Sequence, residues 1–370
     1  MRESVVFTVV QYVEAANGSE RATLVPVELD VDLLTRVFSW VPPRAVFRLR
    51  LLNRVFSALV ASDAFARELL LRCFGAGHRG GSISDALAGI TLGRGSLAVR
   101  KAAEWEELFL QWPPAYQRIF AQEFGARATT LGKVIGLGRG RTLQIPQSIG
   151  LLRNLVRIDL GMCGMAGPIP SELFDVSSLE FLDLSRNRLE GSISSLVGNL
   201  VCLRHLDLQD NHLTGKIPSD SLGRLVHLKH VNLSQNTLSG SIPLDLARCT
   251  SLTVLDLSKN DLEGQIPATI AAGCTLLTHL HLNNNCLTGF IPPLGNLKNL
   301  RSLFIHKNKL EGRIPADIGQ LKQLRHLVAY ANSLSGPLPV EMKDLDELEQ
   351  CNLKSNPGLT CDFDFDFSLS

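Results

Sequence analysis

Side chains that could do chemistry gather within one recurring segment of this sequence, L-x-x-L-x-L-x-x-N-x-L. Six of the nine histidines occupy the variable positions between and beside its leucines. Towards the C-terminus these positions become basic and aromatic, with the residues His279, His281, Phe304, His306, Lys307, His326 and Tyr330. Aromatic rings beside adaptable polar groups are typical of interface hot spots. We therefore predict a ligand-binding surface at these seven residues, termed the histidine–aromatic patch.

The histidines of this patch also raise the question of a metal site. His279 and His281 point the same way on a strand, and His306 is a diagonal neighbour. Zinc requires three or four ligands, usually with thiolates or supporting carboxylates. Because that requirement is demanding, solvated surface histidines are the preferred interpretation. The sequence predicts no metal and no cofactor.

No segment carries the signature of an enzyme. The glycine-rich stretch GLGRGR at residues 136–141 lacks the G-x-x-x-x-G-K-[ST] ending of a phosphate-binding loop and lies in a decayed repeat. The net charge of +1 gives no basic surplus for nucleic acid. No apolar run approaches the roughly 20 residues that a membrane span needs. We therefore predict a protein-binding device that does no catalysis and binds neither nucleic acid nor membrane.

The residues of the predicted surface lie within a series of sequence repeats, whose fold must therefore bring them together. The asparagine of the segment, or the residue in its place, recurs nine times at steps of 23 to 25 residues. This period lies within the range of about 20–29 residues that is typical of leucine-rich repeats. Each copy predicts one short strand, so the copies stack into a parallel sheet. The asparagines are expected to turn inward and bond buried backbone groups. The predicted ladder consists of Asn187, Asn211, Asn236, Asn260, Asn285, Asn308, Asn332 and Asn356.

Most copies end in L-x-G-x-I-P. Proline locks φ and donates no hydrogen bond, so this ending predicts an extended segment on the flank. The pattern resembles the plant-type subclass of leucine-rich repeats, whose solenoids are twisted as well as curved. The resemblance implies an α/β solenoid over residues 129–360, a plant-type leucine-rich-repeat superhelix whose parallel sheet forms the concave face.

A second pattern occupies residues 23–74. Apolar side chains recur there at three- and four-residue steps on either side of Pro42, which predicts short amphipathic helices separated by a proline break. The order VPVEL, LLTRVFSWVPP and VFRLRLLNRVFSAL resembles an F-box. Asp30 and Val31 look like an insertion after the opening phrase, and Phe56 stands where the family usually has tryptophan. The resemblance implies a small all-α bundle before the solenoid.

The F-box resemblance implies a partner. F-boxes bind the Skp-type adaptor of cullin-based ubiquitin ligases, and helices that dock in a groove contact it through residues at three- and four-residue steps. The residues expected to bind the adaptor are Pro26, Leu34, Val37, Phe38, Pro42, Leu49, Leu52 and Phe56. The chain would then be the substrate-recognition subunit of a Skp-cullin-F-box ligase, cytoplasmic or nuclear, with an unidentified protein target on the concave face.

An alternative function stays open. The N-terminal helices would only cap the first repeat, which otherwise exposes its core, and the chain would be a free-standing recognition or scaffold protein, intracellular or secreted. Plant-type repeats are common in extracellular receptors, which resemble one another in a cysteine pair before the first repeat and another after the last. This chain has nothing like the leading pair and only Cys361 at the trailing position. Its N-terminal apolar run, Val5 to Val10, is shorter than the roughly 7–15 residues of a signal-peptide core.

The amino-acid composition predicts the character of the remaining segments. Residues 1–22 are an N-terminal extension, residues 75–99 a Gly/Ser-rich linker, residues 100–128 a helical cap, and residues 361–370 a tail that alternates Asp and Phe. Cys249 and Cys274 occupy the same place in consecutive copies. A disulfide between them is one interpretation, but buried thiols that fill the repeat core are preferred.

Overall fold

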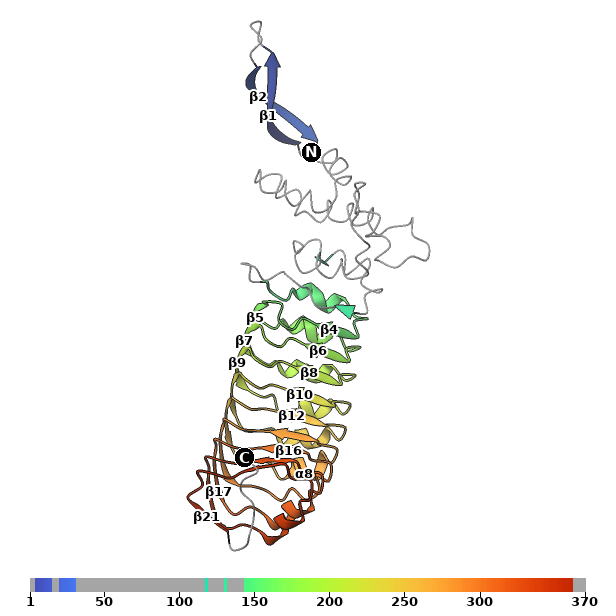
Figure 1. The fold of residues 1–370 in the computed structure, drawn as a ribbon. Coiled ribbons are helices and arrows are strands. Elements are labelled where there is room, and N and C mark those ends of the chain that lie inside the picture. The colour runs from blue at the N-terminus through green and yellow to red at the C-terminus, as the bar shows by residue number, and fades with distance from the viewer. Residues whose placement is uncertain (1–3, 15–19, 31–116, 119–129, 132–142, 362–370) are drawn as a thin grey trace, which may run out of the picture. The chain divides into compact units, whose positions relative to one another are not determined.

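The computed structural model describes residues 4–14, 20–30, 117–118, 130–131 and 143–361 (Figure 1). The chain divides into two units, residues 1–127 and residues 128–370, and each is described by itself. The predicted linker, most of the predicted helical segments and the Asp/Phe tail lie outside the described residues.

In the first unit, a β-hairpin occupies the segment expected to be an N-terminal extension. Strand β1 (Ser4–Glu14) pairs antiparallel with β2 (Glu20–Asp30) along its whole length. The sequence SVVFTVVQYVE is rich in the β-branched and aromatic residues that favour strands. Residues 23–30, at the start of the predicted F-box-like segment, thus form a strand, while the helices predicted from Leu33 onward lie outside the described residues. Pro26 lies in β2 opposite Thr8, which is tolerated because each strand of a two-stranded hairpin is an edge strand.

The second unit is a solenoid with a ten-stranded parallel sheet in the order β20-β18-β16-β14-β12-β10-β8-β6-β4-β3. Adjacent strands pair the same repeat position, as where His205 lies opposite both Phe181 and His230. The variable positions therefore form columns across the sheet. The strands are β3 (Thr130–Leu131), β4 (Arg157–Asp159), β6 (Phe181–Asp183), β8 (His205–Asp207), β10 (His230–Asn232), β12 (Val254–Asp256), β14 (His279–His281), β16 (Ser302–Phe304), β18 (His326–Val328) and β20 (Gln350–Asn352).

A second parallel sheet of nine strands forms at the L-x-G segments. Glycines such as Gly240, at φ 74°, end or bend these strands in a conformation that other residues rarely adopt. The sequence pattern predicted an extended flank here, but no sheet. The strands are β5 (Ala166–Pro168), β7 (Arg188–Ser192), β9 (His212–Lys216), β11 (Thr237–Gly240), β13 (Asp261–Gly264), β15 (Cys286–Phe290), β17 (Lys309–Gly312), β19 (Ser333–Pro337) and β21 (Gly358–Thr360).

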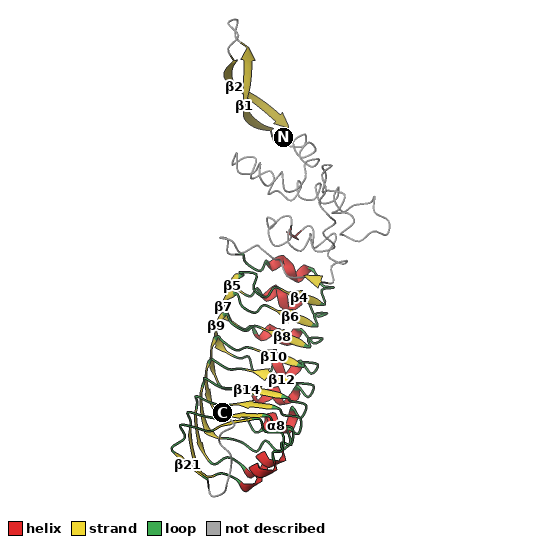
Figure 2. Ribbon diagram, viewed as in Figure 1, coloured by secondary structure: helices red, strands yellow, loops and turns green. Residues whose placement is uncertain are grey.

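Short helices complete the copies, and Figure 2 shows them stacked along one side of the solenoid while the second sheet runs along another. Most are single 3₁₀ turns that follow the Ile-Pro ending, where proline is fixed in an extended conformation. They are η3 (Gln147–Leu151), η4 (Ser171–Asp175), η5 (Ser195–Asn199), η6 (Leu222–Arg224), η7 (Leu244–Arg248), α8 (Thr269–Gly273), η8 (Ala316–Gln320) and η9 (Val340–Asp344). Among the described residues, none of the helices has the length and apolar character that a membrane crossing requires.

The core is made of the repeated leucines, and the asparagines line its edge. Asn260 is typical: its Oδ1 accepts the backbone N–H of Leu238 at 3.0 Å, and its Nδ2 donates to the carbonyls of Leu233 and Leu257 at 3.0 and 3.1 Å. All eight predicted ladder asparagines accept an N–H from the preceding copy and donate to carbonyls of both copies. Each side chain thus joins two copies through otherwise unsatisfied backbone groups.

Two buried cysteines fill the core between copies as free thiols. Cys249 and Cys274 donate from Sγ to the carbonyls of Leu222 and Leu246, each at 3.2 Å. Burial raises the pKa of Cys249 to about 11 and that of Cys274 to about 12, so both thiols stay protonated and unreactive. The structure therefore agrees with the preferred interpretation of packing thiols.

Candidate ligand-binding surface

The outward side of the ten-stranded sheet, termed the concave face, carries all seven residues of the histidine–aromatic patch. β14 supplies His279 and His281, β16 supplies Phe304, and β18 supplies His326. The other three follow the ends of β16 and β18. Lys307 is exposed and the remaining six side chains are half-buried. The repeat register therefore brings together residues that lie up to 51 positions apart in the sequence.

Stacked rings connect the patch from one copy to the next. The rings of His281 and Phe304 stack at 4.5 Å between centroids, and those of His306 and Tyr330 stack at 4.5 Å. The Nζ of Lys307 lies 6.0 Å from the Tyr330 centroid, at the outer limit of a cation–π contact. Adjacent strands hold each pair in register, so the rings present a semi-rigid aromatic surface.

Two histidines of the patch are held by hydrogen bonds to the protein. His281 Nε2 lies 2.9 Å from Ser302 Oγ, and its Nδ1 lies 3.6 Å from a carboxylate oxygen of Asp256. His279 Nδ1 lies 2.8 Å from Thr278 Oγ1. These contacts fix the two rings and engage both ring nitrogens of His281 and one ring nitrogen of His279.

Electrostatics favour uncharged rings in this patch. Burial lowers the pKa of His279 and of His306, and neighbouring positive or imidazole groups lower each further. Burial by itself would raise the pKa of Asp256, but hydrogen bonds from His281 and Ser258 outweigh it and hold the pKa below its usual value. At neutral pH the surface therefore combines the neutral rings of His279 and His306 with the exposed cation Lys307.

The repeated aspartates have a local structural role. Asp183, Asp207 and Asp256 each accept, through Oδ1, the backbone N–H of the residue two positions on, at 2.9 Å. This bond closes the turn after the strand, as such side chains do when they bond their own backbone. The recurrence of these aspartates is therefore explained by the turn and does not by itself mark a ligand site.

A second aromatic stack, which the sequence reasoning missed, lies on the first strands of the concave face. The guanidinium of Arg157 lies 3.5 Å from the ring centroid of Phe181. That ring stacks on His205 at 4.2 Å, and His205 stacks on His230 at 4.4 Å. The signal was present in one column of variable positions, which reads Arg, Phe, His, His. We term these four residues the N-terminal stack.

The N-terminal stack has a distinct electrostatic character. Burial, reinforced by His230, lowers the pKa of His205 to about 4, and burial also lowers the pKa of His230. The neighbouring Asp207 has its pKa raised to about 6, chiefly by burial. Both imidazoles are therefore neutral at pH 7, when Asp207 is mostly ionised.

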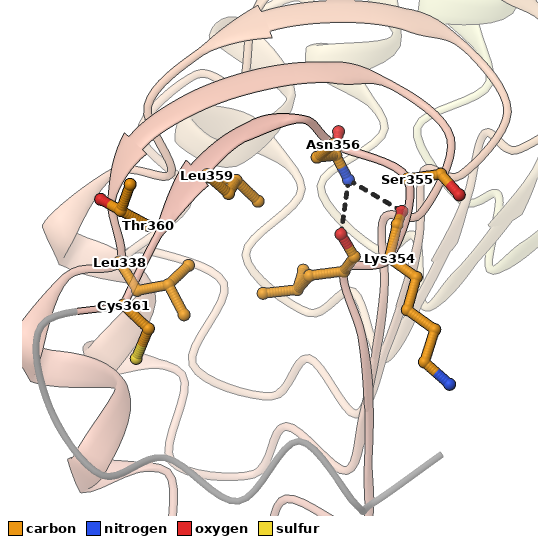
Figure 3. Close-up of a pocket in the computed structure, with 8 residues that line it drawn as sticks. Leu338, Lys354, Ser355, Asn356, Leu359, Thr360 and Cys361 are labelled. Carbon is orange, nitrogen blue, oxygen red and sulfur yellow. Dashed lines mark hydrogen bonds between the residues drawn. The ribbon is translucent and has the colours of Figure 1, made fainter.

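A cavity of about 350 Å³ lies at the C-terminal end of the described solenoid (Figure 3). Leu338, Leu353 and Leu359 line it together with Cys361. Figure 3 shows Asn356 at its edge, with the amide bonded to two backbone carbonyls. The leucines belong to the last two described copies, so the cavity lies at the end of the described core and not on the concave face.

The adaptor-binding prediction lies almost wholly outside the described residues. Pro26 is in β2, and the other seven residues named for it fall in the segment 31–116. Its test must come from binding experiments.

Comparison with known families supports the repeat assignment. Residues 188–332 match the family model of a leucine-rich repeat region. Among curated proteins, none matches the chain. The fold, the ladder and this match together identify the second unit as a solenoid of plant-type leucine-rich repeats.

Several solved structures share this solenoid. The Arabidopsis receptor kinase HAESA, in complex with the peptide hormone IDA and the co-receptor SERK1, is 30% identical at a TM-score of 0.58, over 68% of this chain and 40% of that one. A TDR receptor is 26% identical, with a TM-score of 0.56; the match covers 68% of this chain and 49% of the receptor chain. A plant ice-binding protein is 26% identical, with a TM-score of 0.51; the match covers 67% of this chain and 78% of the ice-binding protein. This chain thus spans less than half the length of the two receptor structures.

Proposed function

We propose that this chain is a recognition protein that binds a peptide or protein segment on its concave face, at the histidine–aromatic patch. The observation that carries the proposal is the pair of ring stacks, His281 on Phe304 and His306 on Tyr330. Half-buried rings that their neighbours already hold lose little conformational entropy on binding. The chain contributes binding and no catalysis of its own.

The chemistry of the patch favours a partner with apolar and aromatic groups and an acidic group near Lys307. Neutral imidazoles offer one donor and one acceptor each, so they suit backbone and side-chain amides of a peptide. The similar receptor HAESA was solved with a peptide hormone, which supports a peptide as the kind of ligand to try first.

Substitution of the stacked rings tests the proposal. Peptides selected from a display library against the intact chain would be measured by calorimetry. We expect Phe304→Ala and Tyr330→Ala each to weaken binding about tenfold, because truncation of a hot-spot aromatic typically costs more than about 1 kcal/mol. Phe290→Ala is the matched control, since Phe290 is 62% exposed on β15 of the second sheet. Unchanged affinity in both ring variants would exclude the patch as the binding site.

A second candidate role is that of substrate receptor in a Skp-cullin-F-box ligase, cytoplasmic or nuclear. The apolar spacing of residues 33–59 favours it, and the concave face would then hold the ligase target. Co-purification of the full chain with a Skp-type adaptor is the test. We expect the double substitution Leu52→Ala and Phe56→Ala to abolish capture of the adaptor, and Phe304→Ala to leave it intact. Failure of the unmodified chain to bind any adaptor would restrict the function to recognition.

A further inference from the structure

Three ligand-type side chains converge on the N-terminal stack. His205 and His230 lie directly opposite each other on the paired strands β8 and β10, and Asp207 lies on the same face of β8, two residues after His205. One potential ligand atom from each residue lies within 4.8 Å of the other two. All three side chains are partly buried.

Each of these three groups keeps a potential ligand atom without a hydrogen-bond partner in the described part of the chain. Within the described residues, no hydrogen bond engages the imidazole nitrogens of His205 or His230, whose contacts are ring stacking. Asp207 uses Oδ1 for the N–H of Gln209, which leaves Oδ2 as a free acceptor. By contrast, His279 and His281 already share nitrogens with hydroxyl or carboxylate groups.

We propose that His205, Asp207 and His230 bind a divalent transition-metal ion of the zinc type, with at least one coordination position open on the concave face. Two imidazoles and one carboxylate are a ligand set that such ions accept, with water or a partner's group completing the coordination. The proposal stands apart from the proposed function, because the ion binds whether or not the patch holds a peptide.

The charges around the three residues favour a cation. The carboxylates of Asp183 and Asp256, in the same column, repel the carboxylate of Asp207, and the guanidinium of Arg186 offsets part of this repulsion. A dication would offset the repulsion and supply the missing partner of both rings, since metal ligation uses the neutral imidazole.

The geometry requires the three ligand atoms to move closer together. In tetrahedral coordination with bonds of about 2.1 Å, two ligand atoms lie about 3.4 Å apart. The three atoms now lie within 4.8 Å of one another, so binding calls for a contraction of up to about 1.4 Å, which side-chain rotation can supply. The two rings are nearly parallel, at 10°, and must tilt for their lone pairs to converge. Phe181 on the other face of His205 restricts that ring, so the tilt falls mainly on His230.

Calorimetric titration of the untagged, chelator-treated full chain with Zn²⁺ tests the site. We expect stoichiometric binding of Zn²⁺ here and no comparable binding of Mg²⁺, which prefers oxygen ligands. The double substitution His205→Gln and His230→Gln should weaken Zn²⁺ binding at least 100-fold, and Asp207→Asn at least tenfold. The matched control, His279→Gln with His326→Gln, removes two histidines of the same face and should leave the affinity unchanged.

A second measurement does not depend on variants. Co²⁺ added in place of Zn²⁺ should give the visible absorption of a nitrogen-ligated ion. Bound Zn²⁺ should also protect His205 and His230, but not the exposed His227, from diethyl pyrocarbonate, as read by mass spectrometry. Equal Zn²⁺ affinity in the double variant and the intact chain, absence of Zn²⁺ binding, or loss of binding only in the control variant would each overturn the proposal.

Discussion

We expect Asn260→Ala to lower the free energy of unfolding by about 3 kcal/mol or more, far beyond an ordinary surface substitution. The change leaves the Leu238 N–H and the carbonyls of Leu233 and Leu257 without their partner in a buried setting. An unsatisfied buried backbone group typically costs about 1–3 kcal/mol, and water that enters the space recovers part of it. Urea denaturation followed by circular dichroism gives the measurement.

Three further variants make the result specific to the ladder. Asn299→Ala is the control, because Asn299 is half-buried and makes a single, solvent-exposed side-chain bond of 3.3 Å; we expect a change within about 0.5 kcal/mol. Asn260→Asp keeps the shape but loses the donors and faces carbonyls with a carboxylate, so it should be at least as damaging as alanine. Asn356→Ala should cost less, since it joins the last described copies, which open locally at lower free energy. Equal effects of Asn260→Ala and Asn299→Ala would contradict the ladder argument.

The sequence was sufficient to predict the parts of the fold that side-chain type determines. Leucines recur at every core position, and an asparagine recurs every 23 to 25 residues. Stacked copies bury all of these side chains in the same way, so the pattern predicts both the parallel sheet and the inward position of Asn260. The sequence also predicts which residues align in one column of the sheet, because one repeat period corresponds to one turn of the solenoid. The repeat period alone therefore places His281 and Phe304 side by side, as the paired strands β14 and β16 confirm.

Features that depend on the backbone or on rotamers could not be predicted in the same way. The second sheet is formed by backbone hydrogen bonds at the L-x-G segments. The residue between the leucine and the glycine is Glu, Thr or Ser in most copies, so these segments lack the apolar pattern of a strand. The stacking of His205 on His230 requires particular side-chain rotamers, which the repeat period does not specify. The apolar run of β1 is too short to distinguish a strand from part of a targeting signal by composition, and its pairing with β2 depends on the backbone.

The concave face therefore has two chemically different parts. The N-terminal stack has imidazoles without hydrogen-bond partners among the described residues, beside a column of carboxylates, whereas His279 and His281 of the histidine–aromatic patch have hydrogen-bond partners. Val254 separates the two parts in the column that contains His230 and His279, and interrupts the ring stacking. Because the parts do not share a ring contact, a substitution in one should leave ligand binding at the other unchanged, which allows the two proposals to be tested separately.

A glycine at the end of α8 supports a second large stability prediction. A Cβ added at Gly273 would overlap the carbonyl oxygen of Ala247 and lie 2.7 Å from its carbonyl carbon, both backbone atoms of η7 in the preceding copy. Backbone cannot rotate aside as a flexible side chain can, so α8 and η7 must separate. We expect Gly273→Ala to destabilise the solenoid by about 3 kcal/mol, at the upper end of overpacking costs. Urea denaturation again gives the measurement.

The sign of the Gly273→Ala effect distinguishes two explanations. Helix propensity alone favours alanine over glycine by up to about 1 kcal/mol, so a helix free of its neighbour would be stabilised. Gly264→Ala is the matched control: its Cβ meets only the Cβ of Ser241 at 3.6 Å, but φ is +77°, so we expect a moderate loss of about 1–2 kcal/mol from backbone strain. If Gly273→Ala proves stabilising, α8 and η7 do not pack as closely as the structure places them. If it costs more than Gly264→Ala, close approach of successive copies, and not the conformational freedom of glycine, is what position 273 requires.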